Sequence, residues 1–120
     1  MITDFMEIFI MTSLHINETI DRVITNNCLT ILQFGSETCG PCHSITHKID
    51  EWLQSHPSVV ERYVPVEDFQ TETAQHEVFG VPTTILYFEG KEILRKSGYY
   101  SLEEFFAKAE RILEITESQE

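Results

Sequence analysis

Two cysteines separated by a glycine and a proline are the residues of this chain best suited to chemistry. Cys39, Gly40, Pro41 and Cys42 follow a short apolar run from Leu29 to Phe34, and proline favours the first position of a helix. A helix N-terminus presents unpaired N–H groups and a partial positive charge, which favour the thiolate form of a cysteine placed there. Helical spacing puts Cys42 on the inward face. The sequence therefore predicts a reactive thiol, Cys39, beside a shielded one, Cys42.

Little else in the sequence is available to activate Cys39. No lysine or arginine occurs between Arg22 and Lys48, and Glu37 would oppose ionisation if it lay close to the thiol. His43 follows the second cysteine directly and could tune Cys39 as a cation. The alternative for His43 is a solvated helix surface, which we favour. Activation is therefore expected to depend mainly on the helix N-terminus.

The cysteine pair admits three chemistries. In thiol–disulfide exchange, Cys39 attacks a substrate disulfide and Cys42 then releases the reduced product. With His43, the pair also spells the C-x-x-C-H pattern of c-type haem attachment, which requires export; no targeting signal is visible. Zinc held by Cys39, Cys42, His43 and His47 is the third reading, but it lacks the second C-x-x-C of zinc ribbons. We favour exchange, with no metal site.

Alternating apolar runs and amphipathic segments position this pair. Asn17 is a plausible helix N-cap, Ser101 with Glu104 spells a capping box, and Pro65 limits its strand to an edge or an irregular position. Residues 5–12 form either a first strand or a short helix. Beyond them, we predict strands at 29–34, 62–66, 83–89 and 92–96, and helices at 17–25, from 41 to before 57, at 71–79 and from 101 onward. This order predicts an α/β fold with a central mixed β-sheet flanked by α-helices on both faces.

Length and charge narrow the class of protein. The chain has 120 residues, which predicts a single domain spanning 1–120. It carries 20 acidic and 8 basic residues, for a net charge of −12, so we expect neither nucleic acid nor a membrane as a partner. Three cysteines do not make a disulfide scaffold. We expect a cytoplasmic monomer that binds partners with basic docking faces.

With its C-G-P-C motif between strand and helix, the sequence resembles the thioredoxin family. A second match is Val81-Pro82-Thr83, which corresponds to the family's cis-proline loop. The resemblance covers roughly residues 17–115. It implies a thioredoxin fold and a protein-disulfide reductase with a redox-active Cys39–Cys42 disulfide and no other cofactor. It also implies a substrate-positioning role for residues 81–83, a motif turn at residues 40–41 that sets the redox poise, and a thioredoxin-reductase-like electron donor.

Several positions depart from the family pattern. Gln33 stands where the family has a buried aspartate that accepts the proton of the resolving cysteine, and a glutamine cannot titrate. Thr38 and Gly35 replace two tryptophans, which makes the substrate-facing surface smaller and more polar. For the lysine that accompanies the aspartate, Tyr63 or Val64 falls nearest. The glutamine at position 33 predicts slower release by the resolving cysteine or a shifted pH optimum.

A second class of function stays open beside the enzyme. In it, the fold serves as a non-catalytic binding module or a redox sensor, and Gln33 reflects relaxed catalytic demand. Turnover of a protein disulfide distinguishes the two. Outside the motif, we interpret Cys28 as a small core residue, and we assign four aromatic residues to the core, namely Phe34, Trp52, Phe79 and Phe88.

Overall fold

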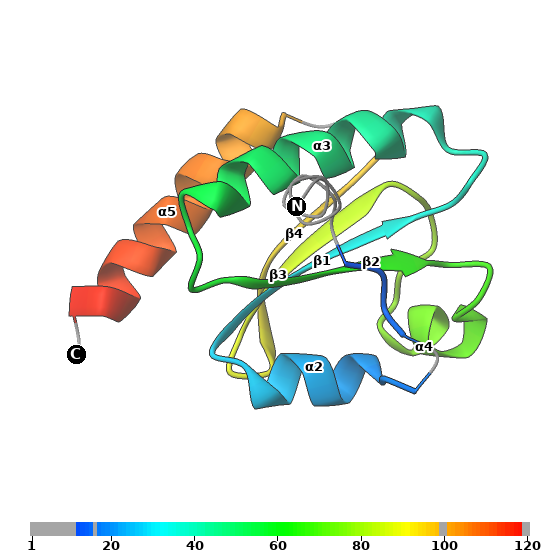
Figure 1. Ribbon diagram of the computed structural model, residues 1–120, viewed down its shortest axis with the longest axis horizontal. Coiled ribbons are helices and arrows are strands. Elements are labelled where there is room, and N and C mark those ends of the chain that lie inside the picture. Colours follow the sequence, from blue (N-terminus) through cyan, green and yellow to red (C-terminus); the bar gives the residue numbers. More distant parts are fainter. Residues whose placement is uncertain (1–11, 16, 99–100, 119–120) are drawn as a thin grey trace, which may run out of the picture.

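A mixed four-stranded sheet forms the centre of the protein (Figure 1). The computed structural model describes residues 12–15, 17–98 and 101–118. The strands lie in the order β2-β1-β3-β4, with bounds Leu29–Gly35 for β1, Val60–Pro65 for β2, Thr83–Phe88 for β3 and Lys91–Ser97 for β4. The helices are α2 (Ile20–Asn26), α3 (Gly40–Gln54), α4 (Gln70–Gln75) and α5 (Leu102–Ser118). The prediction of a first strand or a short helix at residues 5–12 lies almost wholly outside the described residues, which begin at residue 12.

The central strand β1 sets the position of the cysteine motif. All seven of its residues are buried, as its mostly apolar run predicts for a strand covered on both faces. It pairs in parallel with β2 and antiparallel with β3. The register places Phe34 opposite Thr83, so the end of β1 meets the start of β3. The loop that follows β1 therefore leaves the sheet beside the segment that precedes β3.

Each face of the sheet is covered by a pair of helices. In Figure 1, α3 and α5 lie over one face, and α2 and α4 lie over the other. Alternation along β1 divides its side chains between two clusters: Ile31 packs with α3 and α5, whereas Leu32 and Phe34 pack with α2. The mixed sheet with helices on both faces confirms the predicted fold class. None of the helices in the described ranges is long and apolar enough to cross a membrane.

The hairpin between β3 and β4 turns through Glu89 and Gly90. Both residues have positive φ, 49° and 85°, as a two-residue turn between antiparallel strands requires when it follows the twist of the strands. The hairpin was predicted through Gly90. In the structure, β3 ends one residue earlier than predicted, and β4 extends from Lys91 to Ser97.

The boundaries of helices α2 and α4 differ from the prediction. The N-cap of α2 is Thr19, whose Oγ1 accepts a hydrogen bond from the Arg22 N–H at 3.2 Å, and not Asn17. The predicted helix at 71–79 is the shorter α4. At α5, the Glu104 N–H donates to Ser101 Oγ at 3.4 Å, which is half of the predicted capping box.

Two residues assigned to the core are exposed. Cys28 is exposed because it precedes the first residue of β1, so its side chain lies outside the layer that the helices cover. Phe79 is 85% exposed, because α4 ends at Gln75 and the chain has already left the helix when it reaches this residue. Both predictions were therefore wrong.

Candidate active site

A disulfide joins Cys39 and Cys42 at the N-terminus of α3. Their Cα atoms are 5.4 Å apart. Cys39 is the N-cap residue and is partly exposed, whereas Cys42 is 1% exposed. One sulfur is therefore within reach of a partner and the other is covered by protein.

The backbone before α3 holds the two cysteines in place. The Cys39 N–H donates to the Ser36 carbonyl, and the Cys42 N–H donates to the Cys39 carbonyl, both at 3.2 Å. Pro41 occupies the first turn, which carries no acidic side chain, and no side chain caps the helix. The partial positive charge of the helix N-terminus is therefore not compensated within the helix, and it acts on the Cys39 position.

The loop before β3 lies beside the start of the motif. Phe34 and Thr83 form the last antiparallel pair of the register, and Gly35 and Pro82 are the next residues along the chain on either side of it. The Val81–Pro82 peptide bond is cis. Two hydrogen bonds fix this loop: Thr83 Oγ1 donates to the Gly80 carbonyl at 2.7 Å, and the Gly98 N–H donates to the Pro82 carbonyl at 2.9 Å. The sheet itself thus brings residues 81–83 next to the cysteine loop.

Polar side chains lie along the face of the sheet that α3 covers, on the strand that leads to the cysteine motif. Gln33 is fully buried, and its Oε1 accepts a hydrogen bond from Thr84 Oγ1. Gly35 leaves room for Tyr63: a Cβ added to this glycine would lie 2.6 Å from Tyr63 Oη and 3.1 Å from Cys42 Sγ. The sequence left Tyr63 and Val64 as equal candidates for this place. The register selects Tyr63, which pairs with Gln33, while Val64 belongs to the cluster on the other face.

The remaining predicted residues do not converge on the disulfide. Thr38 is exposed, and its hydroxyl lies 3.2 Å from that of Ser36. His43 is exposed, and His47 pairs with Glu51 at 2.7 Å instead of facing the cysteines. Within the described ranges, no three histidine, cysteine or acidic side chains are grouped so that they could hold a metal ion. His43 therefore lies on a solvent-exposed helix surface, as in the interpretation that we favour from the sequence.

An apolar hollow of about 380 Å³ adjoins the cis-proline loop. Val66, Val78, Gly80 and Val81 line it, and the exposed ring of Phe79 stands at its side. Sequence reasoning missed this surface because Phe79 had been assigned to the core. The sequence does place Phe79 directly before Gly80 and Val81, and this position beside the predicted substrate-positioning loop could have indicated a surface role.

The comparison with protein families decides the family. The thioredoxin family model matches residues 11–111. This chain belongs to the thioredoxin family. Among curated relatives, it is 23% identical to the thioredoxin-like protein YdfQ of Bacillus subtilis over 109 residues, covering 91% of this chain and 97% of that protein. It is 33% identical to a thioredoxin of Chlamydia caviae over 70 residues, covering 58% of this chain and 69% of that protein.

Solved thioredoxin structures share the fold. Chlamydomonas reinhardtii thioredoxin f2 superposes with a TM-score of 0.74 at 18% identity, covering 84% of this chain and 94% of that one. Thioredoxins carry a redox-active disulfide and need no separate cofactor, and the Cys39–Cys42 bond occupies that place here. Family membership and the close cysteine pair together support thiol–disulfide oxidoreductase activity in general.

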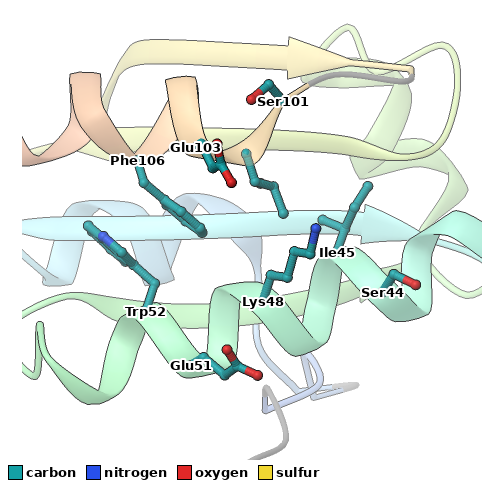
Figure 2. Close-up of a pocket in the computed structure, with 9 residues that line it drawn as sticks. Ser44, Ile45, Lys48, Glu51, Trp52, Ser101, Glu103 and Phe106 are labelled. Carbon is teal, nitrogen blue, oxygen red and sulfur yellow. The ribbon is translucent and has the colours of Figure 1, made fainter.

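A second hollow, of about 640 Å³, lies between α3 and α5 (Figure 2). Trp52 and Phe106 line it at the left of the view and stack with ring centroids 5.0 Å apart. Lys48, Glu51 and Glu103 are among its polar lining residues. The lining includes no cysteine or histidine. In this thioredoxin-family protein, the redox chemistry is therefore assigned to the disulfide.

Proposed function

We propose that this protein reduces disulfide bonds in other proteins through Cys39 and Cys42. The observation that supports this most is the unequal exposure of the two sulfurs, with Cys39 accessible at the helix N-terminus and Cys42 1% exposed. An exchange reaction needs one thiolate that meets the substrate and a second that is shielded from it. The C-G-P-C motif resembles that of reducing family members. Electrons come from a thioredoxin-reductase-like donor.

The exchange proceeds in two displacements. The Cys39 thiolate attacks one sulfur of the substrate disulfide, forms a mixed disulfide and expels the other substrate sulfur as a thiolate, which takes a proton from solvent. The Cys42 thiol then loses its proton, and its sulfur attacks Cys39, forms the intramolecular disulfide and expels the second substrate thiolate. Two electrons pass from the protein to the substrate. The electron donor restores both thiols.

The cis-proline loop is suited to hold an extended substrate segment. Within the described ranges, neither the N–H nor the C=O of Val81 makes a hydrogen bond. Both groups are available to pair with a peptide laid beside the loop, in the manner of strand addition. The neighbouring apolar hollow then receives a substrate side chain next to the ring of Phe79. This supports a protein as the substrate in preference to a small disulfide.

A turnover assay tests the proposed function. We expect the protein, with dithiothreitol as reductant, to accelerate the reduction of insulin disulfides well above the rate with dithiothreitol alone. The precipitation of the freed insulin B chain reports the rate. A rate equal to that of dithiothreitol alone would contradict the reductase proposal and would favour a binding module.

Phe79 is expected to contribute to protein binding without contributing to the chemistry. Phe79→Ala removes an aromatic ring from the side of the hollow, and we expect the KM for insulin to rise about tenfold, corresponding to a binding residue of moderate strength. The rate of attack on a small aromatic disulfide should stay within about twofold, because no macromolecular contact is lost. Equal effects on both substrates would place Phe79 in the chemistry and contradict this assignment.

A further inference from the structure

Tyr63 brings a hydroxyl group to the buried sulfur of the redox pair. Its Oη and its Cε1 lie 2.6 Å and 2.9 Å from the position that a Cβ on Gly35 would take, and Cys42 Sγ lies 3.1 Å from that same position. The phenol oxygen and the resolving sulfur therefore both border the space that a side chain at Gly35 would fill. The absence of a side chain at Gly35 is what allows this approach.

The sheet register makes this placement specific. Tyr63 pairs with Gln33 across β1 and β2, and Gly35 lies two residues further along β1, on the same face. Helix α3 covers this face, and Cys42 points inward from its first turn. Tyr63 also has fixed backbone partners, since its N–H donates to the Thr12 carbonyl and its C=O accepts from the Leu14 N–H, both at 2.8 Å.

The Tyr63 hydroxyl is an available donor on the face of the sheet that carries Gln33 and Gly35. The Gln33 Oε1 is engaged by Thr84, and the Gln33 Nε2 faces the Phe34 carbonyl at 3.4 Å. In the described part of the chain, the Tyr63 hydroxyl makes no hydrogen bond. A disulfide sulfur is a poor acceptor, whereas a thiolate is a strong one, so this hydroxyl gains a partner when the pair is reduced.

The phenol keeps its proton under the conditions of the exchange. Burial raises the pKa of Tyr63, and the carboxylates of Glu67 and Glu37, after β2 and before α3, raise it further. The phenol therefore acts as a hydrogen-bond donor and not as a base.

We propose that the Tyr63 hydroxyl donates a hydrogen bond to the Cys42 thiolate and so promotes the resolving step. This inference rests on the proposed thiol–disulfide exchange. The proton of the Cys42 thiol goes to solvent, the sulfur retains the electron pair, and the phenol stabilises that charge without giving up its own proton. The thiolate then attacks Cys39 of the mixed disulfide, the new S–S bond forms, and the substrate thiolate leaves with the electrons of the broken bond.

Tyr63→Phe tests the proposal, because it removes the hydroxyl and keeps the ring. Reduced protein is mixed with less than one equivalent of dithiobis(nitrobenzoate) in a stopped-flow instrument. The first thionitrobenzoate released reports attack by Cys39, and the second reports attack by Cys42. A Cys28→Ser background prevents reaction of the exposed thiol. Circular dichroism and a thermal melt check that the variant is folded.

We expect the second release to slow about threefold at neutral pH in the Tyr63→Phe variant, because losing one hydrogen bond lowers the thiolate fraction about tenfold while the more basic thiolate that remains is more nucleophilic. Its pH midpoint should rise by about one unit, and the first release should be unchanged. The matched control is Tyr87→Phe, which removes a hydroxyl 3.3 Å from His76 on the opposite face of the sheet. We expect both of its rates to equal those of the parent.

Because the two thionitrobenzoate releases are measured separately, failure of the proposal for Tyr63 can be distinguished from failure of the exchange function. If both releases proceed in the parent and the Tyr63→Phe variant shows the same second rate and midpoint, the role of Tyr63 is overturned and the exchange function stands. If Tyr63→Phe slows both steps equally, the hydroxyl does not act on Cys42, and the proposal is likewise overturned. If the folded parent releases no thionitrobenzoate, the exchange function itself fails, and this inference fails with it.

Discussion

Replacing Cys39 by serine is expected to lower the rate of insulin reduction by at least about a thousandfold, to the rate of the reductant alone. The serine hydroxyl is not ionised at neutral pH, and the helix N-terminus cannot make it a nucleophile comparable to a thiolate. Cys42 cannot substitute, because it is 1% exposed and a protein substrate does not reach it. The insulin precipitation assay, with variant and wild type at equal concentration, measures the loss.

Cys28→Ser is the matched control for this loss. Cys28 is the free cysteine of the chain and is exposed ahead of β1, outside the redox pair. The same chemical change there should leave the rate unchanged within about twofold. A Cys39→Ser variant with substantial activity, or a Cys28→Ser variant without it, would contradict the assignment of the nucleophile.

The largest expected effect on stability follows Phe34→Ala. Phe34 is fully buried in the cluster between the sheet and α2, one residue before the end of β1. Removing a fully buried phenyl ring costs about 3–5 kcal/mol of unfolding free energy, through lost transfer energy and the cavity that is left. For a domain of this size, the melting temperature should fall by roughly 10 °C or more. Chemical denaturation followed by circular dichroism measures the free energy of unfolding, and a thermal melt measures the melting temperature.

Phe79→Ala is the control for this stability loss. The chemical change is the same, but Phe79 is 85% exposed, so its removal should change the unfolding free energy by no more than about 0.5 kcal/mol. Equal destabilisation by the two variants would contradict the division between core and surface described above. The contrast also supports the binding role of Phe79, because a loss of affinity in a fully stable variant has no folding explanation.

The fold could be predicted from the sequence because the strongest patterns and the tertiary packing agree. The apolar run at 29–34 is buried as β1, and the proline at position 41 marks the start of α3. Gly90 marks the turn of the hairpin, and Ser101 caps α5. At these sites, local preference and global packing favour the same structure.

The rest depended on information that a local pattern does not contain. Residue type assigned Cys28 and Phe79 to the core, but their exposure follows from where β1 begins and α4 ends. The proximity of Tyr63 to Cys42 depends on the pairing register between β1 and β2, which brings together residues about 20 positions apart in the chain. The residues of the cysteine motif could be predicted from the sequence, whereas the position of Tyr63 could be found only from the strand pairing in the structure.

Trapping of a mixed disulfide tests the central claim most directly. Cys42→Ser removes the resolving thiol, so the adduct between Cys39 and a protein substrate should accumulate instead of being released. We predict that this variant, reduced and mixed with insulin, gives a covalent adduct that mass spectrometry of the digested product assigns to Cys39 and that dithiothreitol reverses. The same treatment of a Cys39→Ser, Cys42→Ser double variant should give no such adduct. No adduct with the single variant, or one formed only through Cys28, would contradict the account.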